Sequence, residues 1–167
     1  EFIPKWTLAA GLGFEQSQLS VQTINYTAGA VSGRSGAERS FSNWAPELSV
    51  SWKPADGYRH WVRASTGYAI PGFGNLLTNP FTGLAGTNFD LKPQKNLNVE
   101  IGTESRLHKT LTVQLVGFVT FVKDEIITQV VSNTGGQAAI NADSSQYRGI
   151  ELFYDWRPLD GLRLSGA

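Results

Sequence analysis

The chain of 167 residues carries 14 basic and 14 acidic side chains, a formal net charge of zero that argues against a nucleic-acid-binding protein. It contains no cysteine, which excludes a disulfide framework and a thiolate metal site. No run of about 18 apolar residues occurs, which excludes a transmembrane helix but not transmembrane β-strands, whose signal per segment is much weaker.

Apolar and polar residues alternate with period two along most of the chain, a pattern that predicts β-strands. We predict about seven of them, paired with their sequence neighbours in one all-β, antiparallel sheet. In chain order, the predicted strands are residues 5–15, 44–53, 59–69, 97–104, 111–121, about 147–156, and a last strand that begins at Leu162.

The connections between these strands alternate between long and short. Turn-forming residues predict short turns at 54–57 and 158–161. Residues 106–110 form a third short connection, between two long alternating strands. Residues 16–43 are too long for a tight hairpin and are expected to form a large loop, with or without strand extensions. Residues 70–77 and 88–93 belong to a second long loop. Residues 123–146 form the third, in which 126–131 are expected to prolong the preceding strand up to a turn at 133–136.

The two faces of the predicted strands differ in charge. One is apolar and almost free of charge, and we expect it to be the convex, lipid-side face, with Leu97, Val99, Ile101, Leu111, Val113 and Leu115. The other is the concave face, with Glu15, Glu47, Arg63, Glu100, Glu104, Gln114, Glu151 and Asp155. Trp6, Trp52 and Trp156 fall at the short-turn end, where an interfacial aromatic belt belongs. These features are typical of an up-and-down transmembrane β-barrel.

Two other β architectures remain open at this point. A soluble β-sandwich also alternates, with its apolar face turned inward. A complete small outer-membrane barrel needs about eight strands, and an odd number with an unfinished last strand argues against it. We therefore expect the chain to be a piece of a longer protein.

The sequence offers no catalytic constellation, and we predict neither an enzyme, nor a metal site, nor a cofactor. His60 and His108 have no serine–carboxylate pattern around them. Asp124 and Glu125 are adjacent strand residues that point to opposite faces, so they cannot act on one bond. Asparagines and aspartates such as Asn88 and Asn141 lack the spacing of a calcium loop.

Several motifs in a fixed order resemble those of TonB-dependent outer-membrane receptors, over about the C-terminal two-thirds of the chain. They are Gly67-Tyr68-Ala69-Ile70-Pro71-Gly72-Phe73-Gly74-Asn75-Leu76, residues 90–95 (DLKPQK), residues 99–102 (VEIG), Phe118, residues 123–126 (KDEI), Asn141 and residues 147–152 (YRGIEL). Two departures are visible: Ala69-Ile70 stands where the family more often has an arginine, and Gln94 where it usually has a glutamate.

The resemblance implies about seven strands of a 22-stranded barrel, a size at which barrels are plugged. Residues 1–167 would belong to a single barrel domain in the outer membrane of a Gram-negative bacterium, in contact with its lipid. The plug domain and the segment that contacts the partner TonB would lie outside this chain. The implied function is energised uptake of a scarce nutrient, above all a ferric siderophore, and sometimes cobalamin, haem or a sugar. A passive porin-like or structural barrel and a soluble carbohydrate-binding β domain are the alternatives.

Any ligand contacts are expected at the long-loop end. Arg34 and Arg39 are the best candidates for an anionic ligand such as a ferric siderophore, because arginine presents a planar fork to carboxylates. Tyr68, Phe73 and Asn75 are weaker candidates. The alternative is that both arginines are solvated loop charges.

Overall fold

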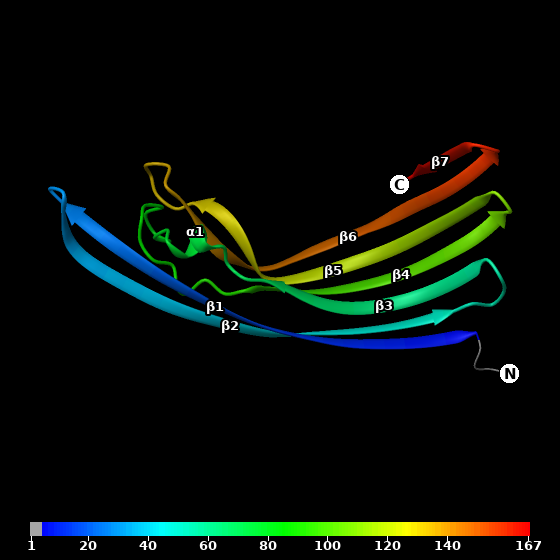
Figure 1. Cartoon of the computed structure of the whole chain (residues 1–167), viewed down its shortest axis with the longest axis horizontal. Helices are drawn as coiled ribbons and strands as arrows, with labels where there is room; N and C mark the ends of the chain where they lie inside the picture. The colour runs from blue at the N-terminus through cyan, green and yellow to red at the C-terminus, as the bar shows by residue number, and fades with distance from the viewer. Residues whose placement is uncertain (1–4) are drawn as a thin grey trace.

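The computed structural model describes residues 5–167 and, at residues 23, 25, 26 and 32–37, the backbone alone. The chain forms one seven-stranded antiparallel sheet in which every strand pairs with the next along the sequence (Figure 1). This confirms the predicted strand number and order. The sheet is open within the chain, with the first and last strands at its two edges.

The strands are β1 (Trp6–Thr27), β2 (Ala30–Trp52), β3 (Tyr58–Ala69), β4 (Gln94–His108), β5 (Leu111–Val130), β6 (Gln137–Leu159) and β7 (Leu162–Gly166). A four-residue helix, α1 (Phe73–Leu76), interrupts the connection between β3 and β4, where the sequence predicted only a loop. None of the helical structure in the described residues has the length and apolar character needed to cross a membrane.

The segment 16–43, predicted as a large loop, is instead the far part of a long hairpin. β1 and β2 stay paired up to a two-residue turn at Ala28 and Gly29. Both turn residues have positive φ, 52° and 80°, as a type I′ hairpin turn requires. The strand extensions that the prediction allowed therefore occupy almost the whole segment, because the two backbones pair whatever side chains they carry and the many Gly, Ser and Gln residues weaken the period-two signal.

The hairpin of β5 and β6 is also longer than predicted. The expected extension of β5 is confirmed, since the strand runs to Val130, and the turn lies at residues 131–136. The start of β6 was placed wrongly, because the strand begins at Gln137 rather than at about Tyr147. Residues 137–146 are mostly small and polar, so only their partner strand makes them β-structure.

The two ends of the sheet differ, as the alternating connections predicted. Three short turns, at residues 53–57, 109–110 and 160–161, lie together at one end, called here the short-turn end (Figure 1). The hairpins β1–β2 and β5–β6 and the connection 70–93 project at the other, the long-arm end. Gly57 and Gly161 each adopt φ 82° in their turns, a conformation that glycine takes without strain.

The register confirms how the two faces are divided. Val99 lies opposite Val119, whereas Glu100 lies opposite Phe118 and Glu104 opposite Gln114. The face that carries Val99 is called the apolar face and the face that carries Glu100 the polar face. On the apolar face Leu8, Ile101 and Ile150 are 70%, 63% and 78% exposed. The described chain forms one sheet, and no second layer covers these side chains as it would in a sandwich.

The connection 70–93, called here the plate loop, folds back onto the sheet at the long-arm end. β2 and β3 are paired from Trp52–His60 to Glu47–Ser65. Beyond Glu47–Ser65, toward the long-arm end, the β1–β2 hairpin diverges from β3. The plate loop packs there, with Leu76 and Leu91 buried against β6 and against Leu19 of β1. Leu19 lies four residues after Glu15 on β1 and therefore on the same face of the sheet. The plate loop thus covers the polar face.

Candidate functional site: the polar face and the plate loop

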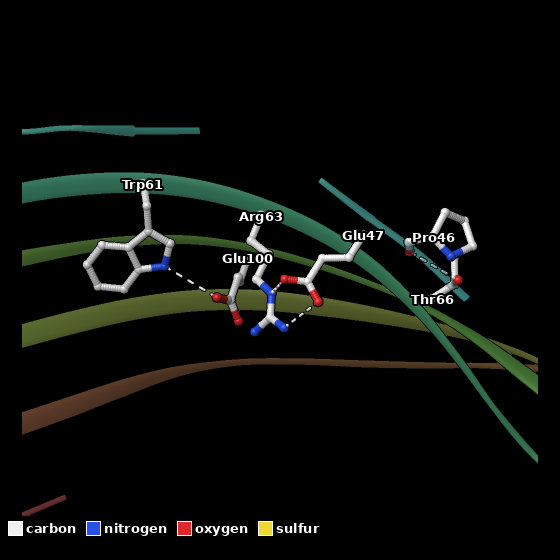
Figure 2. Close-up of polar contacts among 6 residues, drawn as sticks. All are labelled: Pro46, Glu47, Trp61, Arg63, Thr66 and Glu100. Atoms are coloured by element: carbon white, nitrogen blue, oxygen red, sulfur yellow. Dashed lines mark hydrogen bonds and ion pairs between the residues drawn. The ribbon is translucent and has the colours of Figure 1, made fainter. Parts of the chain in front are cut away.

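A ladder of charged side chains crosses the polar face on β2, β3 and β4 (Figure 2). The Arg63 guanidinium donates from Nε to Oε1 of Glu47 at 3.0 Å and from Nη2 to Oε2 at 2.8 Å. On the other side of the ladder, the Trp61 indole Nε1 donates to Oε1 of Glu100 at 3.3 Å. The two parallel bonds between Arg63 and Glu47 fix both side chains against the sheet and compensate both charges.

The ladder continues toward the short-turn end. Arg59 Nη2 lies 3.5 Å from Oε2 of Glu104, and the Arg59 Cζ lies 4.8 Å from the centroid of the Trp61 ring. Asp155 pairs with Arg163 at 2.8 Å and with Arg157 at 3.6 Å. Three carboxylates of the polar face, Glu47, Glu104 and Asp155, are thus paired with arginines, which suits a water-filled or protein-filled lumen.

Two aromatic rings on this face lie flat over glycines of the neighbouring strand. A Cβ on Gly102 would lie 2.1 Å from Cζ2 of Trp61, its cross-strand partner. A Cβ on Gly149 would lie 2.9 Å from Phe118, again its direct partner. The glycines let the rings lie on the sheet instead of standing into the lumen, and this places the Trp61 N–H next to Glu100.

The plate loop is fastened to the sheet through Asn141 of β6. Asn141 Oδ1 accepts the Lys92 backbone N–H at 2.7 Å, and its Nδ2 donates to the Lys92 carbonyl at 2.9 Å and the Asp124 carbonyl at 2.8 Å. Asp124 has φ 54°, and this break in β5 accompanies a carbonyl that bonds to Asn141. One side chain thus joins the plate loop to both strands of the β5–β6 hairpin.

Two further side chains repeat this fastening. Asn88, which is 5% exposed, donates from Nδ2 to the Ala139 carbonyl at 2.8 Å. Gln94 Oε1 accepts the Ile126 N–H at 3.2 Å. A glutamate at position 94 would present the same acceptor oxygen, so the departure noted in the sequence preserves this contact. The motifs 90–95, 123–126 and Asn141 are distant in sequence, and here they meet.

The tip of the plate loop touches the tip of the β5–β6 hairpin through two glycines. A Cβ on Gly136 would lie 2.0 Å from the Thr82 carbonyl oxygen, and one on Gly83 would lie 2.4 Å from the Gly136 backbone. The two backbones approach this closely only because neither residue has a side chain. The plate loop and the hairpin therefore form one packed unit.

Glu125 adds a polar contact within the same hairpin. Its carboxylate accepts hydrogen bonds from the Ser145 hydroxyl and, at 2.6 Å, from the Tyr147 hydroxyl. These two bonds hold the pKa of Glu125 below its usual value, so the group is ionised at neutral pH. The contact of Glu125 with Ser145 and Tyr147 could not be predicted from the sequence, because it depends on how β5 and β6 pair.

The five residues predicted to contact ligand all lie toward the long-arm end. The backbone of Arg34 pairs with Ile24 near the hairpin tip, and its side chain lies outside the described part of the structure. Arg39 is half-buried, with its Cζ 5.4 Å from the Phe41 ring centroid. It lies opposite Leu19, the residue of β1 that contacts the plate loop.

The other three are at the base of the plate loop. Tyr68 is the second-last residue of β3, and its buried hydroxyl has no hydrogen-bond partner among the described residues. Phe73 opens α1 and is 52% exposed, whereas Asn75 is half-buried and its backbone N–H donates to the Gly72 carbonyl at 3.0 Å. Two large apolar side chains that the sequence did not single out, Phe81 and Leu84, are 80% and 69% exposed on the same loop.

The two histidines have local structural contacts. His60 packs on Trp52, with ring centroids 5.5 Å apart, and His108 Nδ1 lies 2.9 Å from the Thr110 hydroxyl in a short turn. Neither neighbour is a carboxylate or a nucleophile poised for catalysis.

A continuous antiparallel sheet with one exposed apolar face, one charge-paired face, short turns at one end and long arms at the other is the wall of a transmembrane β-barrel. The whole chain, residues 1–167, matches the family model described as TonB dependent receptor-like, beta-barrel. The chain belongs to this family, as its motifs suggested. The family comprises receptors and transporters of the Gram-negative outer membrane rather than enzymes.

Solved structures share the same sheet. The copper transporter OprC matches with a TM-score of 0.74 at 17% identity, over 95% of this chain and 25% of that one. The ferric yersiniabactin uptake receptor FyuA from Yersinia pestis matches with a TM-score of 0.70 at 21% identity, over 98% and 23%. The Serratia marcescens hemophore receptor HasR, in complex with HasA and heme, gives 0.68 at 16% identity, over 92% and 29%. The chain thus spans less than a third of each of these structures.

Proposed function

We propose that the protein to which this chain belongs is an outer-membrane receptor for active uptake of a scarce nutrient, with a ferric siderophore as the leading candidate. Its energy would arrive through TonB, and the plug and the TonB-contacting segment would lie outside residues 1–167. The observation that carries the proposal is the match of the entire chain to a receptor barrel family. Residues 1–167 would supply part of the wall of its single barrel domain.

The geometry is consistent with this role. The polar face carries charged side chains, several of them in arginine–carboxylate pairs, so it presents a hydrophilic wall. The plate loop is fixed over that face at the long-arm end, which would be the extracellular mouth because outer-membrane barrels carry their longer loops there. A ligand arriving from outside would meet the plate loop and the β1–β2 arm first.

The test is uptake by the full-length protein in cells. A strain lacking the receptor is complemented with the intact gene and supplied with a panel of radiolabelled ferric siderophores, haem and cobalamin, with and without TonB. Accumulation of one ligand that requires both the receptor and TonB supports the proposal. Entry of small solutes that does not depend on TonB would instead identify a passive porin-like barrel.

We further propose that Arg34 and Arg39 contact the ligand, assisted by Tyr68, Phe73 and Asn75. An Arg34→Ala, Arg39→Ala double variant of the full-length receptor should bind an anionic ferric siderophore about tenfold or more weakly, since each charged hydrogen bond contributes roughly 1.5–3 kcal/mol. Lys53→Ala with Lys109→Ala removes the same charge at the short-turn end and serves as the control. Unchanged affinity in the arginine variant would show that both arginines are solvated charges.

A further inference from the structure

The apolar face carries a groove of about 470 Å³ that runs across the strands. Its floor is opened by Gly117, which lies in register between Ile101 of β4 and Ile150 of β6. These two isoleucines are 63% and 78% exposed and stand on either side of the glycine. The groove is therefore a gap in an otherwise continuous aliphatic surface, and it exists because one side chain is missing.

At its other end the groove meets a cluster of aromatic rings. Trp6 stacks on Trp52 with ring centroids 5.7 Å apart, and Trp52 packs on His60 at 5.5 Å. Trp52 is the last residue of β2, so this cluster marks the short-turn boundary of the apolar band. Interfacial tryptophans occupy such boundaries because an indole has an apolar body and one N–H donor for lipid carbonyl or phosphate oxygens.

The register shows that the groove climbs into the apolar band. The residue row that begins at Trp6, Trp52 and His60 continues through Thr103 and Leu115 to Leu152. Trp52 ends its strand, whereas Leu152 lies well inside β6, which continues to Leu159. Because barrel strands tilt by about 35–45°, a path across them rises through the membrane. The groove thus leads from the headgroup level to the middle of the band.

We propose that this groove is a binding site for one acyl chain of a glycerophospholipid. The glycerol and headgroup region lies at the Trp6–Trp52–His60 cluster, and the chain lies over Gly117 between Ile101 and Ile150. The apolar lining suits an acyl chain, and the polar atoms of the cluster stand only at the end where the ester groups lie. The proposal rests on the placement of this protein in the outer membrane, as proposed above.

The test uses the full-length receptor in vesicles that contain a phosphatidylethanolamine with a photoactivatable diazirine in one acyl chain. Adducts mapped by mass spectrometry should concentrate on Ile101, Leu115 and Ile150. A Gly117→Leu variant should reduce these adducts about tenfold by filling the groove, a change equivalent to ~1.4 kcal/mol. The substitution has room, since a Cβ at Gly117 meets nothing closer than the Ile101 Cγ2 at 3.8 Å.

Gly11→Leu is the matched control, because a Cβ at Gly11 also has its nearest contact at 3.8 Å but lies on the polar face with Glu47. It should leave the adducts unchanged. If Gly117→Leu does not fold, Ile101→Ala with Ile150→Ala removes the walls, and adducts on the unchanged Leu115 should fall by the same factor. Even labelling of the whole apolar face, or adducts unaffected by these variants, would overturn the site while keeping the receptor in the membrane. Absence of adducts anywhere on the apolar face would contradict the membrane placement itself.

Discussion

At the scale of single residues, glycines and aromatic rings are matched across the strands. Trp61 covers Gly102, Phe118 covers Gly149, and on the apolar face Tyr154 lies against Gly166. A glycine in a strand has no side chain to pack, and a neighbouring ring supplies that missing contact surface. These pairs fix the register locally, because a shift by one residue would move each ring to the wrong face.

A Gly102→Val substitution tests this matching. Its Cβ would lie 2.1 Å from the Trp61 ring, so the ring must leave the sheet and give up its bond to Glu100. Overpacking of this kind costs about 1–3 kcal/mol. Urea unfolding of the full-length receptor should show the loss, and adding Trp61→Ala should recover part of it. If the double variant is no more stable than Gly102→Val alone, the clash with Trp61 is not the cause.

The Glu47–Arg63 pair should contribute little despite its good geometry (Figure 2). Both side chains are about two-fifths exposed, at 42% and 41%, so water and salt screen the attraction. A double-mutant cycle with Glu47→Gln and Arg63→Gln should give a coupling energy below about 1 kcal/mol, falling as salt rises. A larger, salt-independent coupling would mean that the complete barrel buries this pair.

At the scale of elements, the plate loop and the β5–β6 hairpin are fastened together by side-chain amides rather than by a large core. The buried cluster consists of Leu76, Leu91 and Ala139, with a few half-buried neighbours. Hydrogen bonds made by the side chains of Asn88, Gln94 and Asn141 also hold these segments in place. Such a unit should hold its position while remaining easier to open than the sheet below it.

Asn141→Ala should release the plate loop. The change removes three hydrogen bonds and leaves the backbone groups of Lys92 and Asp124 without those partners. Because Asn141 Oδ1 accepts the Lys92 N–H and each hydrogen bond contributes about 0.5–1.5 kcal/mol, the Lys92 amide should exchange hydrogen about tenfold faster or more. The sheet amides of β3 and β4 should not change. Asn133→Ala, in the exposed turn of the same hairpin, is the control, and equal effects of the two substitutions would contradict the role of Asn141.

At the scale of the whole molecule, the sheet has two unsatisfied edges and one uncovered face. β1 and β7 each have one partner strand only, and the apolar face stays exposed along its length. In lipid each unpaired backbone group costs several kcal/mol, so an open sheet is not stable there. In water the same edges and the aliphatic face promote association. The sheet needs the rest of a barrel to complete it.

We therefore expect residues 1–167 alone to associate in detergent-free buffer and to show neither stable membrane insertion nor transport. Sedimentation velocity together with thermal unfolding would measure this. A monodisperse monomer that unfolds cooperatively would contradict the expectation, because the apolar face would then have a partner within the chain. The full-length receptor, prepared in detergent, provides the comparison.

The sequence by itself determined which residues share the apolar face and which share the polar face. The long strands place most Leu, Val and Ile on the opposite face from Glu, and a period of two makes that division independent of the neighbouring strands. The short turns at 54–57 and 158–161 were also determined, because Pro fixes φ, Asp bonds to the nearby backbone and Gly permits the positive φ that these turns need. The motifs around Gly67–Leu76 and Asn141 identified the family before their contacts were known.

Only the tertiary structure decided the extent of the arms and the place of the plate loop. Residues 16–43 and 137–146 are rich in small and polar side chains, so their period-two signal is weak, and pairing with the adjacent strand makes them β-structure. The plate loop is held by hydrogen bonds of side-chain amides to residues up to 51 positions away, such as the bond from Asn88 to Ala139. Local sequence carries no signal for such contacts, because they depend on which backbone groups the register of β5 and β6 brings beside the loop.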